Sequence, residues 1–140
     1  MSHGDYSHRD VVDKLGVRPG QAVAFAEEGW RIEASLCQRV LARVGRPPAE
    51  AGEPLDIALV AVDHEVDLVG VLGRWKACVK PAGGIWLITP KRGHPGYVGE
   101  QALIAAGQAA GLVDNKVCSL SDTASAMRFV IRRTDRPTAT

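Results

Sequence analysis

Three apolar runs in this sequence are each followed directly by side chains that could do chemistry. The first run is followed by Glu27, Glu28, Gly29 and Trp30, the second by Asp63 and His64, and the third by Lys91, Arg92, His94 and Tyr97. A polar segment nearer the C-terminal end adds Ser121, Asp122 and Thr123. Ligands of open α/β sheets bind beyond the carboxyl ends of the parallel strands. We therefore expect these residues to line one edge of one sheet, with Lys91 and Arg92 facing the two glutamates.

This set of side chains favours binding of an anion over a covalent reaction. Lys91 and Arg92 are suited to a phosphate or a carboxylate, and His64 could exchange a proton near neutral pH. Each residue also has a structural interpretation: Asp63 as a helix cap, His64 and the two cations as solvated surface, and Trp30 as packing. Neither a G-x-S-x-G nor a G-x-x-x-x-G-K-[ST] motif is present. We predict no catalytic residue, no cofactor and no metal site.

Composition narrows the class of protein. A chain of 140 residues forms one domain, and a net charge of +1 provides no field to attract nucleic acid or an anionic membrane. The three cysteines, Cys37, Cys78 and Cys118, are far apart, which argues against a disulfide framework and against zinc. We expect a cytoplasmic protein with a flexible tail over 1–12, one domain over 13–134 and a second tail over 135–140.

Strands and helices are expected to alternate along that domain. Apolar runs over 22–26, 55–62 and 85–89 predict strands, and helical patterns follow them over 33–45, 63–79 and 99–111. Two further strands, over 115–120 and 127–133, are too closely spaced for a crossover and must form an antiparallel hairpin. The order predicts a doubly wound α/β fold with a mostly parallel sheet of about five strands. The basic stretch RFVIRR is typical of a solvated edge strand.

Residues 55–133 resemble the fourth strand onward of class I S-adenosylmethionine-dependent methyltransferases. The matching positions are an acidic residue near the start of one strand, Asp56, and the turn before the next, which contains Lys80, Pro81, Gly83 and Gly84. This likeness implies a truncated Rossmann-like fold. Residues 15–133 look closer still to a small bacterial family of domains of unknown function. The segments that carry that second likeness are LGVRPGQAVAF, GGIWLITPK and GLVDNKVCSLSDTASAMRFVIR, and it implies no established activity.

The first strand departs from the methyltransferase pattern. There the strand leads into a glycine-rich loop, whereas here it ends in AFAEEGWRIE, and two carboxylates are poor partners for the carboxylate of that cofactor. The segment before Leu55 is also too short for two further β-α units. We therefore predict a non-catalytic binding or protein-interaction module, pairing with a second copy or another protein through the edge at the first strand. The alternative is a small enzyme or ligand-binding protein of the methyltransferase type, acting on an anionic or nucleotide-like ligand.

Overall fold

The computed structural model describes residues 10–136. Most of both expected tails, with His3 and His8, lies outside the described residues. The elements in chain order are α2 (Val11–Lys14), β1 (Val23–Glu27), α3 (Ala34–Val44), β2 (Leu55–Ala61), α4 (Leu68–Lys76), β3 (Val79–Pro90), α5 (Glu100–Ala109), β4 (Leu112–Ser119), β5 (Ala124–Ile131) and the short 3-10 turn η1 (Arg133–Asp135). From β1 onward, the predicted alternation of strands and helices is confirmed.

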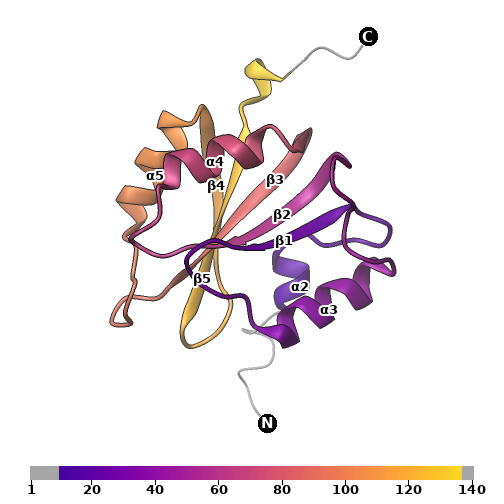
Figure 1. Cartoon of the computed structure of the whole chain (residues 1–140), viewed down its shortest axis with the longest axis horizontal. Helices are drawn as coiled ribbons and strands as arrows, with labels where there is room; N and C mark the ends of the chain where they lie inside the picture. Colours follow the sequence, from indigo (N-terminus) through magenta and orange to yellow (C-terminus); the bar gives the residue numbers. More distant parts are fainter. Residues whose placement is uncertain (1–9, 137–140) are drawn as a thin grey trace.

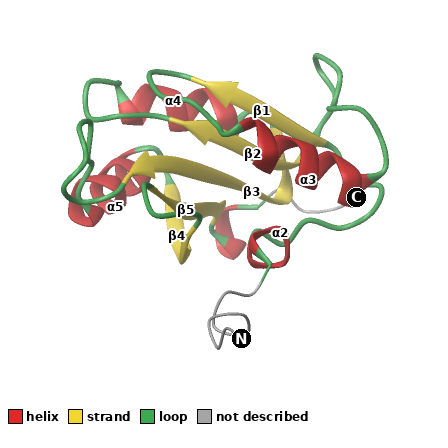
Figure 2. Cartoon of the chain, turned by 90° about the horizontal axis from the view of Figure 1, so that it is seen from below, coloured by secondary structure: helices red, strands yellow, loops and turns green. Residues whose placement is uncertain are grey.

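The five strands form one sheet in the order β1-β2-β3-β5-β4. Strands β1, β2 and β3 run parallel, and β5 pairs antiparallel with both β3 and β4. Helices α4 and α5 cover one face, while α2 and α3 cover the other (Figure 1). The sheet is strongly twisted, as the view at right angles shows (Figure 2). The predicted α/β architecture with a C-terminal antiparallel hairpin is therefore confirmed.

The core is divided between the two faces of the sheet because alternate residues of each strand point to opposite sides. Leu87 and Phe129 are buried toward α4 and α5, and Leu59 and Trp86 toward α2 and α3. The Trp86 indole Nε1 donates a hydrogen bond to the Leu15 carbonyl at 3.1 Å. This bond fixes α2, a helix that the sequence patterns did not predict, against the middle of the sheet. Its first two residues fall in the expected N-terminal tail.

Strand β3 is longer than predicted at its start. The expected turn over 81–84 is a bulge within the strand, because pairing with β2 shifts from Leu55–Val79 to Ile57–Gly84. Gly83 is required there, since a Cβ atom on it would lie 2.8 Å from the Leu55 carbonyl oxygen. The turn residues of the methyltransferase resemblance therefore let two parallel strands approach across an irregular register.

Two local predictions were wrong. Helix α4 begins at Leu68, and its N-cap is Asp67, whose Oδ1 accepts from the Gly70 N–H at 3.1 Å. Asp63 instead accepts from the Glu65 N–H at 3.0 Å and holds a turn before the helix. The basic stretch belongs mostly to β5, which lies between β3 and β4, so the edge strand on that side is β4.

Candidate functional site

The residues that the sequence predicted for the site do lie beyond the carboxyl ends of β1, β2 and β3, but in two separate groups. The first group, which we call the closed half, follows β1 and β2 and contains Glu27, Glu28, Gly29, Trp30, Asp63 and His64. The second group follows β3 and lies beside the tip of the β4–β5 hairpin; it contains Lys91, Arg92, Ser121 and Asp122.

Glu28 joins the end of β1 to helix α4. One of its carboxylate oxygens pairs with Arg74, and the other accepts from the Trp75 indole Nε1 at 2.9 Å. Its backbone N–H continues the ladder with β2 by donating to the Ala61 carbonyl at 2.8 Å. This side chain is thus committed to the packing of α4 and does not face Lys91 or Arg92.

Glu27 points to the opposite face of the sheet, as strand alternation requires. Its Oε2 accepts from the Ile32 N–H at 2.8 Å, which closes the loop that leads into α3. Burial raises the pKa of the nearby Cys37 thiol, and the Glu27 carboxylate raises it further. A thiol whose pKa is raised is a weak nucleophile. Trp30 is half-buried and packs with the core under α3.

Gly29 holds the β1 loop directly against the β2 loop. Its φ is +111°, in the region that disfavours side chains. A Cβ atom here would lie 2.4 Å from Val66 Cγ2 and 3.1 Å from Asp63 Oδ1. The glycine therefore serves close packing within the protein, where the methyltransferase pattern has a backbone that approaches a cofactor.

The β2 and β3 loops meet at His64, whose backbone N–H donates to the Gly96 carbonyl at 3.1 Å. The His64 and His94 side chains are both exposed. His64 therefore joins two loops through its backbone and leaves its imidazole in solvent.

Lys91 links β3 to the tip of the hairpin. Its Nζ donates to Ser119 Oγ at 2.6 Å, and its backbone N–H donates to the Thr123 carbonyl at 2.8 Å. Ser121 Oγ accepts from the Thr123 and Ala124 N–H groups at 3.2 and 3.1 Å and so shapes the hairpin turn. Asp122 is exposed at the tip of that turn.

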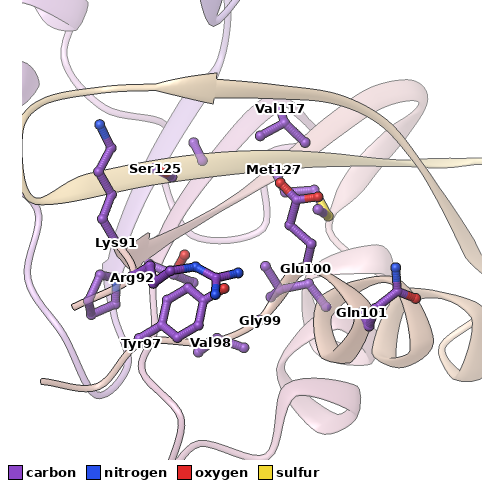
Figure 3. A pocket seen from close by; sticks show the side chains of 14 residues that line it. Lys91, Arg92, Tyr97, Val98, Gly99, Glu100, Gln101, Val117, Ser125 and Met127 are labelled. Carbon is purple, nitrogen blue, oxygen red and sulfur yellow. The ribbon is translucent and has the colours of Figure 1, made fainter. Parts of the chain in front are cut away.

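A groove of about 670 Å³ opens beside these residues, between the start of α5 and the ends of β3, β4 and β5 (Figure 3). We call it the α5 groove. The Arg92 guanidinium lies over the Tyr97 ring, 5.4 Å from its centroid. Val117 contributes apolar surface, since it is 52% exposed although it lies on the face of the sheet that α4 and α5 cover, and its cross-strand partner Met127 is buried. The groove therefore combines two cations, an aromatic ring and apolar surface with one carboxylate, that of Glu100 from the first turn of α5.

The sequence analysis found the cations of this groove but missed much of its lining. The residues that it missed include Glu100 and Gln101 from the first turn of α5, Val117 from β4, and Ser125 and Met127 from β5. It also missed Ser119, the hydrogen-bond partner of Lys91. One signal was available: in a β-α unit the helix must begin at the carboxyl edge of the preceding strand. That rule points to Glu100 and Gln101. The residues from β4 and β5 depend on the register of the hairpin, which the sequence does not give.

Over residues 10–136, no group of three or more His, Cys, Asp or Glu side chains is arranged to hold a metal ion. Across the same range, no helix has the length and apolar character needed to cross a membrane. All three cysteines are free.

Solved structures with this architecture define the fold class. The chain aligns with a putative methyltransferase from Thermoplasma acidophilum at a TM-score of 0.61 and 9% identity, covering 84% of this chain and 70% of that one. It aligns with an S-adenosylmethionine-dependent O-methyltransferase from Thermotoga maritima at a TM-score of 0.62 and 10% identity, covering 95% of this chain and 67% of that one. With a mitomycin 7-O-methyltransferase the TM-score is 0.63 and the identity is 16%, and the chain covers only 55% of the length of that protein. At these identities the likeness shows the fold alone, a methyltransferase-like Rossmann fold.

The family follows from the sequence. Residues 12–133 match the family model described as "Protein of unknown function (DUF3052)", and the chain belongs to this family. No curated protein sequence matches the chain.

Proposed function

We propose that this protein is a non-catalytic binding module whose α5 groove holds a small molecule with an anionic group and an apolar body. The observation that carries the proposal is the lining of the groove. Lys91 and Arg92 stand at one end, and neither makes a salt bridge with a carboxylate among residues 10–136. The exposed apolar surface at Val117 matches the general pattern of ligand sites, which combine apolar surface with a few placed polar groups.

The closed half of the edge supports a role other than methyl transfer. The loop after β1 is engaged by α4 through Glu28 and by the β2 loop through Gly29. A cofactor at the place of the methyltransferase glycine loop would have to displace both contacts. We therefore place the ligand of this protein at the β3 end of the edge.

A thermal-shift comparison tests the proposal. Phenyl phosphate and benzoate carry an anion on an apolar ring, and inorganic phosphate carries the anion alone. A ligand at 100 times its Kd raises the free energy of unfolding by about 2.7 kcal/mol. We expect the ring-bearing anions to raise Tm more than phosphate does at equal ionic strength.

Variants locate the binding. The double variant Lys91→Gln, Arg92→Gln should abolish the shift, while Arg31→Gln, an exposed arginine beyond the β1 end, should retain it. Equal shifts in all three proteins would overturn the proposal. A shift with S-adenosylmethionine that the double variant retains would favour the alternative, an enzyme of the methyltransferase type.

We also propose that the edge of β1 pairs with a second copy of the chain. Ala22 and Glu28 direct backbone groups toward β2, so the odd-numbered residues between them face outward. The Val23 carbonyl accepts from the Ala49 N–H at 2.9 Å, whereas among residues 10–136 Phe25 has no partner beyond the edge. Light scattering that finds a monomer over a wide concentration range would reject this pairing.

The free thiols support a reducing location, and we propose the cytoplasm.

A further inference from the structure

Four basic side chains converge on the face of the sheet opposite the α5 groove. Lys14 comes from α2, Arg18 from the loop after it, Lys116 from β4 and Arg128 from β5. They line two adjoining hollows of about 280 and 460 Å³, which share Lys14, Lys116 and Trp86. We call these hollows together the α2 groove. It lies between α2 and the β4–β5 hairpin.

The arrangement of these charges is unfavourable for the protein alone. Lys116 and Arg128 are direct cross-strand partners in the antiparallel pair of β4 and β5, and both point toward α2. Like charges in this position destabilise a sheet. Lys14 and Arg18 add positive charge from the other wall of the groove. Such a cluster gains stability when an anion lies between its members.

The acidic residues that line the groove are already paired elsewhere. Asp13 accepts from Arg43 at 2.7 Å. Asp56 accepts from Lys80 at 3.0 Å and from the Ala22 N–H at 2.8 Å. Among residues 10–136, none of the four groove cations makes a salt bridge. The groove therefore has an excess of positive charge although the whole chain has a net charge of only +1.

Arg128 is seated by the shape of the neighbouring strand. A Cβ atom at Gly84 would lie 2.5 Å from Arg128 Nε and 3.0 Å from its Nη2, so the glycine makes room for the guanidinium against the backbone of β3. Arg128 is half-buried, and burial together with the charge of Arg136 lowers the pKa of its guanidinium. A guanidinium that is partly removed from water and lacks a carboxylate partner is prepared to bind an anion directly.

We propose that the α2 groove binds a multiply charged phosphate, such as the diphosphate group of a small molecule. Arginine and lysine together suit phosphate oxygens, arginine through its planar fork and lysine as a point charge. Trp86 lies beneath the groove but is fully buried, so no aromatic face is offered to a base. The groove therefore recognises the phosphate itself and not a base attached to it. The α5 groove opens on the other face of the sheet, and the two grooves adjoin at Val117 of β4.

Titration calorimetry with inorganic pyrophosphate, at an ionic strength held constant with sodium chloride, tests the proposal. We expect binding to the wild-type protein that Arg128→Gln weakens at least tenfold and that Arg31→Gln leaves unchanged. If Arg128→Gln does not fold, Arg128→Lys keeps the charge without the planar fork and should weaken binding by a smaller factor. Inorganic phosphate should bind more weakly than pyrophosphate, since it bridges fewer of the cations.

The variant Lys116→Gln adds a second measurement, which distinguishes anion binding from a purely structural role of these cations. Removing one of two facing like charges should raise Tm in the absence of pyrophosphate, and pyrophosphate should then stabilise the variant less than the wild type. Two results would overturn the proposal. One is the absence of pyrophosphate binding to the wild type. The other is an equal loss of affinity in Arg128→Gln and Arg31→Gln, which would mark a general salt effect.

Discussion

The carboxyl edge of the sheet is built differently at its two ends. At the β1–β2 end, Glu28 and Gly29 are consumed by contacts with α4 and with the neighbouring loop. At the β3–β5 end, Lys91 and Arg92 border an open groove with apolar walls. The two ends differ because each strand end brings its own loop: the loops at the first end are filled by contacts within the protein, and those at the second leave a groove open. Mutations at the first end should therefore change stability, and mutations at the second should change binding.

Gly29→Ala should show the largest effect. The substitution combines a backbone at φ +111° with a Cβ atom 2.4 Å from Val66, so we expect a loss of about 3 kcal/mol in the free energy of unfolding. Gly93→Ala is the matched control, because Gly93 has φ +89° and nothing within 4 Å of the added atom. It should cost only about 1 kcal/mol. Equal losses in urea unfolding would mean that the β1 loop is not packed as described.

Glu28→Ala comes next. The change leaves the Trp75 indole N–H without its acceptor in a half-buried position, which should cost about 1–2 kcal/mol. Glu28→Gln keeps an acceptor and loses only the pair with the exposed Arg74, so it should cost less than about 1 kcal/mol. Urea midpoints measure both. If the two variants were equally destabilised, the ion pair, and not the indole bond, would hold β1 to α4.

The double variant Lys91→Gln, Arg92→Gln should leave stability within about 0.5 kcal/mol of the wild type. Both residues lie on the surface, and glutamine at position 91 retains a donor for Ser119. The same variant should lose the binding of ring-bearing anions. If this variant unfolded more readily and still bound the ring-bearing anions, the β3–β5 end would serve stability and not binding.

Asp10 gives the smallest effect and lies away from the whole edge. It accepts from the Val12 N–H and pairs with Arg39, and these contacts lower its pKa from the ordinary 3.8. The stabilisation is thus present above that value and lost as the pH falls through the lower folded-state pKa. Tm of the wild type should exceed that of Asp10→Asn at neutral pH, and the difference should vanish in strong acid. A difference that persisted there would mean that the charge of Asp10 is not its cause.

The sequence was informative where structure is local. The buried runs of β2 and β3 and the helical pattern of α3 predicted the fold, since strand burial and helix periodicity are encoded by adjacent residues. Helix α2 was missed because its apolar pattern spans only four residues. Glu28 could not be assigned, since its partners lie 46 and 47 residues away. The α2 groove was hidden for the same reason: Arg128 belonged to a predicted edge, and only the order of the strands places it inside the sheet.

That strand order also affects how the chain reaches its native state. Among the five strands of this sheet β5 is the last to be synthesised, yet it lies between β3 and β4 and supplies the second neighbour of β3. Until residues 124–131 are synthesised, β3, which is buried from Gly83 to Pro90, has one unpaired edge. Folding must then wait for this insertion, which brings together segments that are distant in the chain, and such non-local pairing is slow. Until β5 is in place, the nascent chain therefore exposes an unpaired β3 edge, and unpaired strand edges are prone to aggregation.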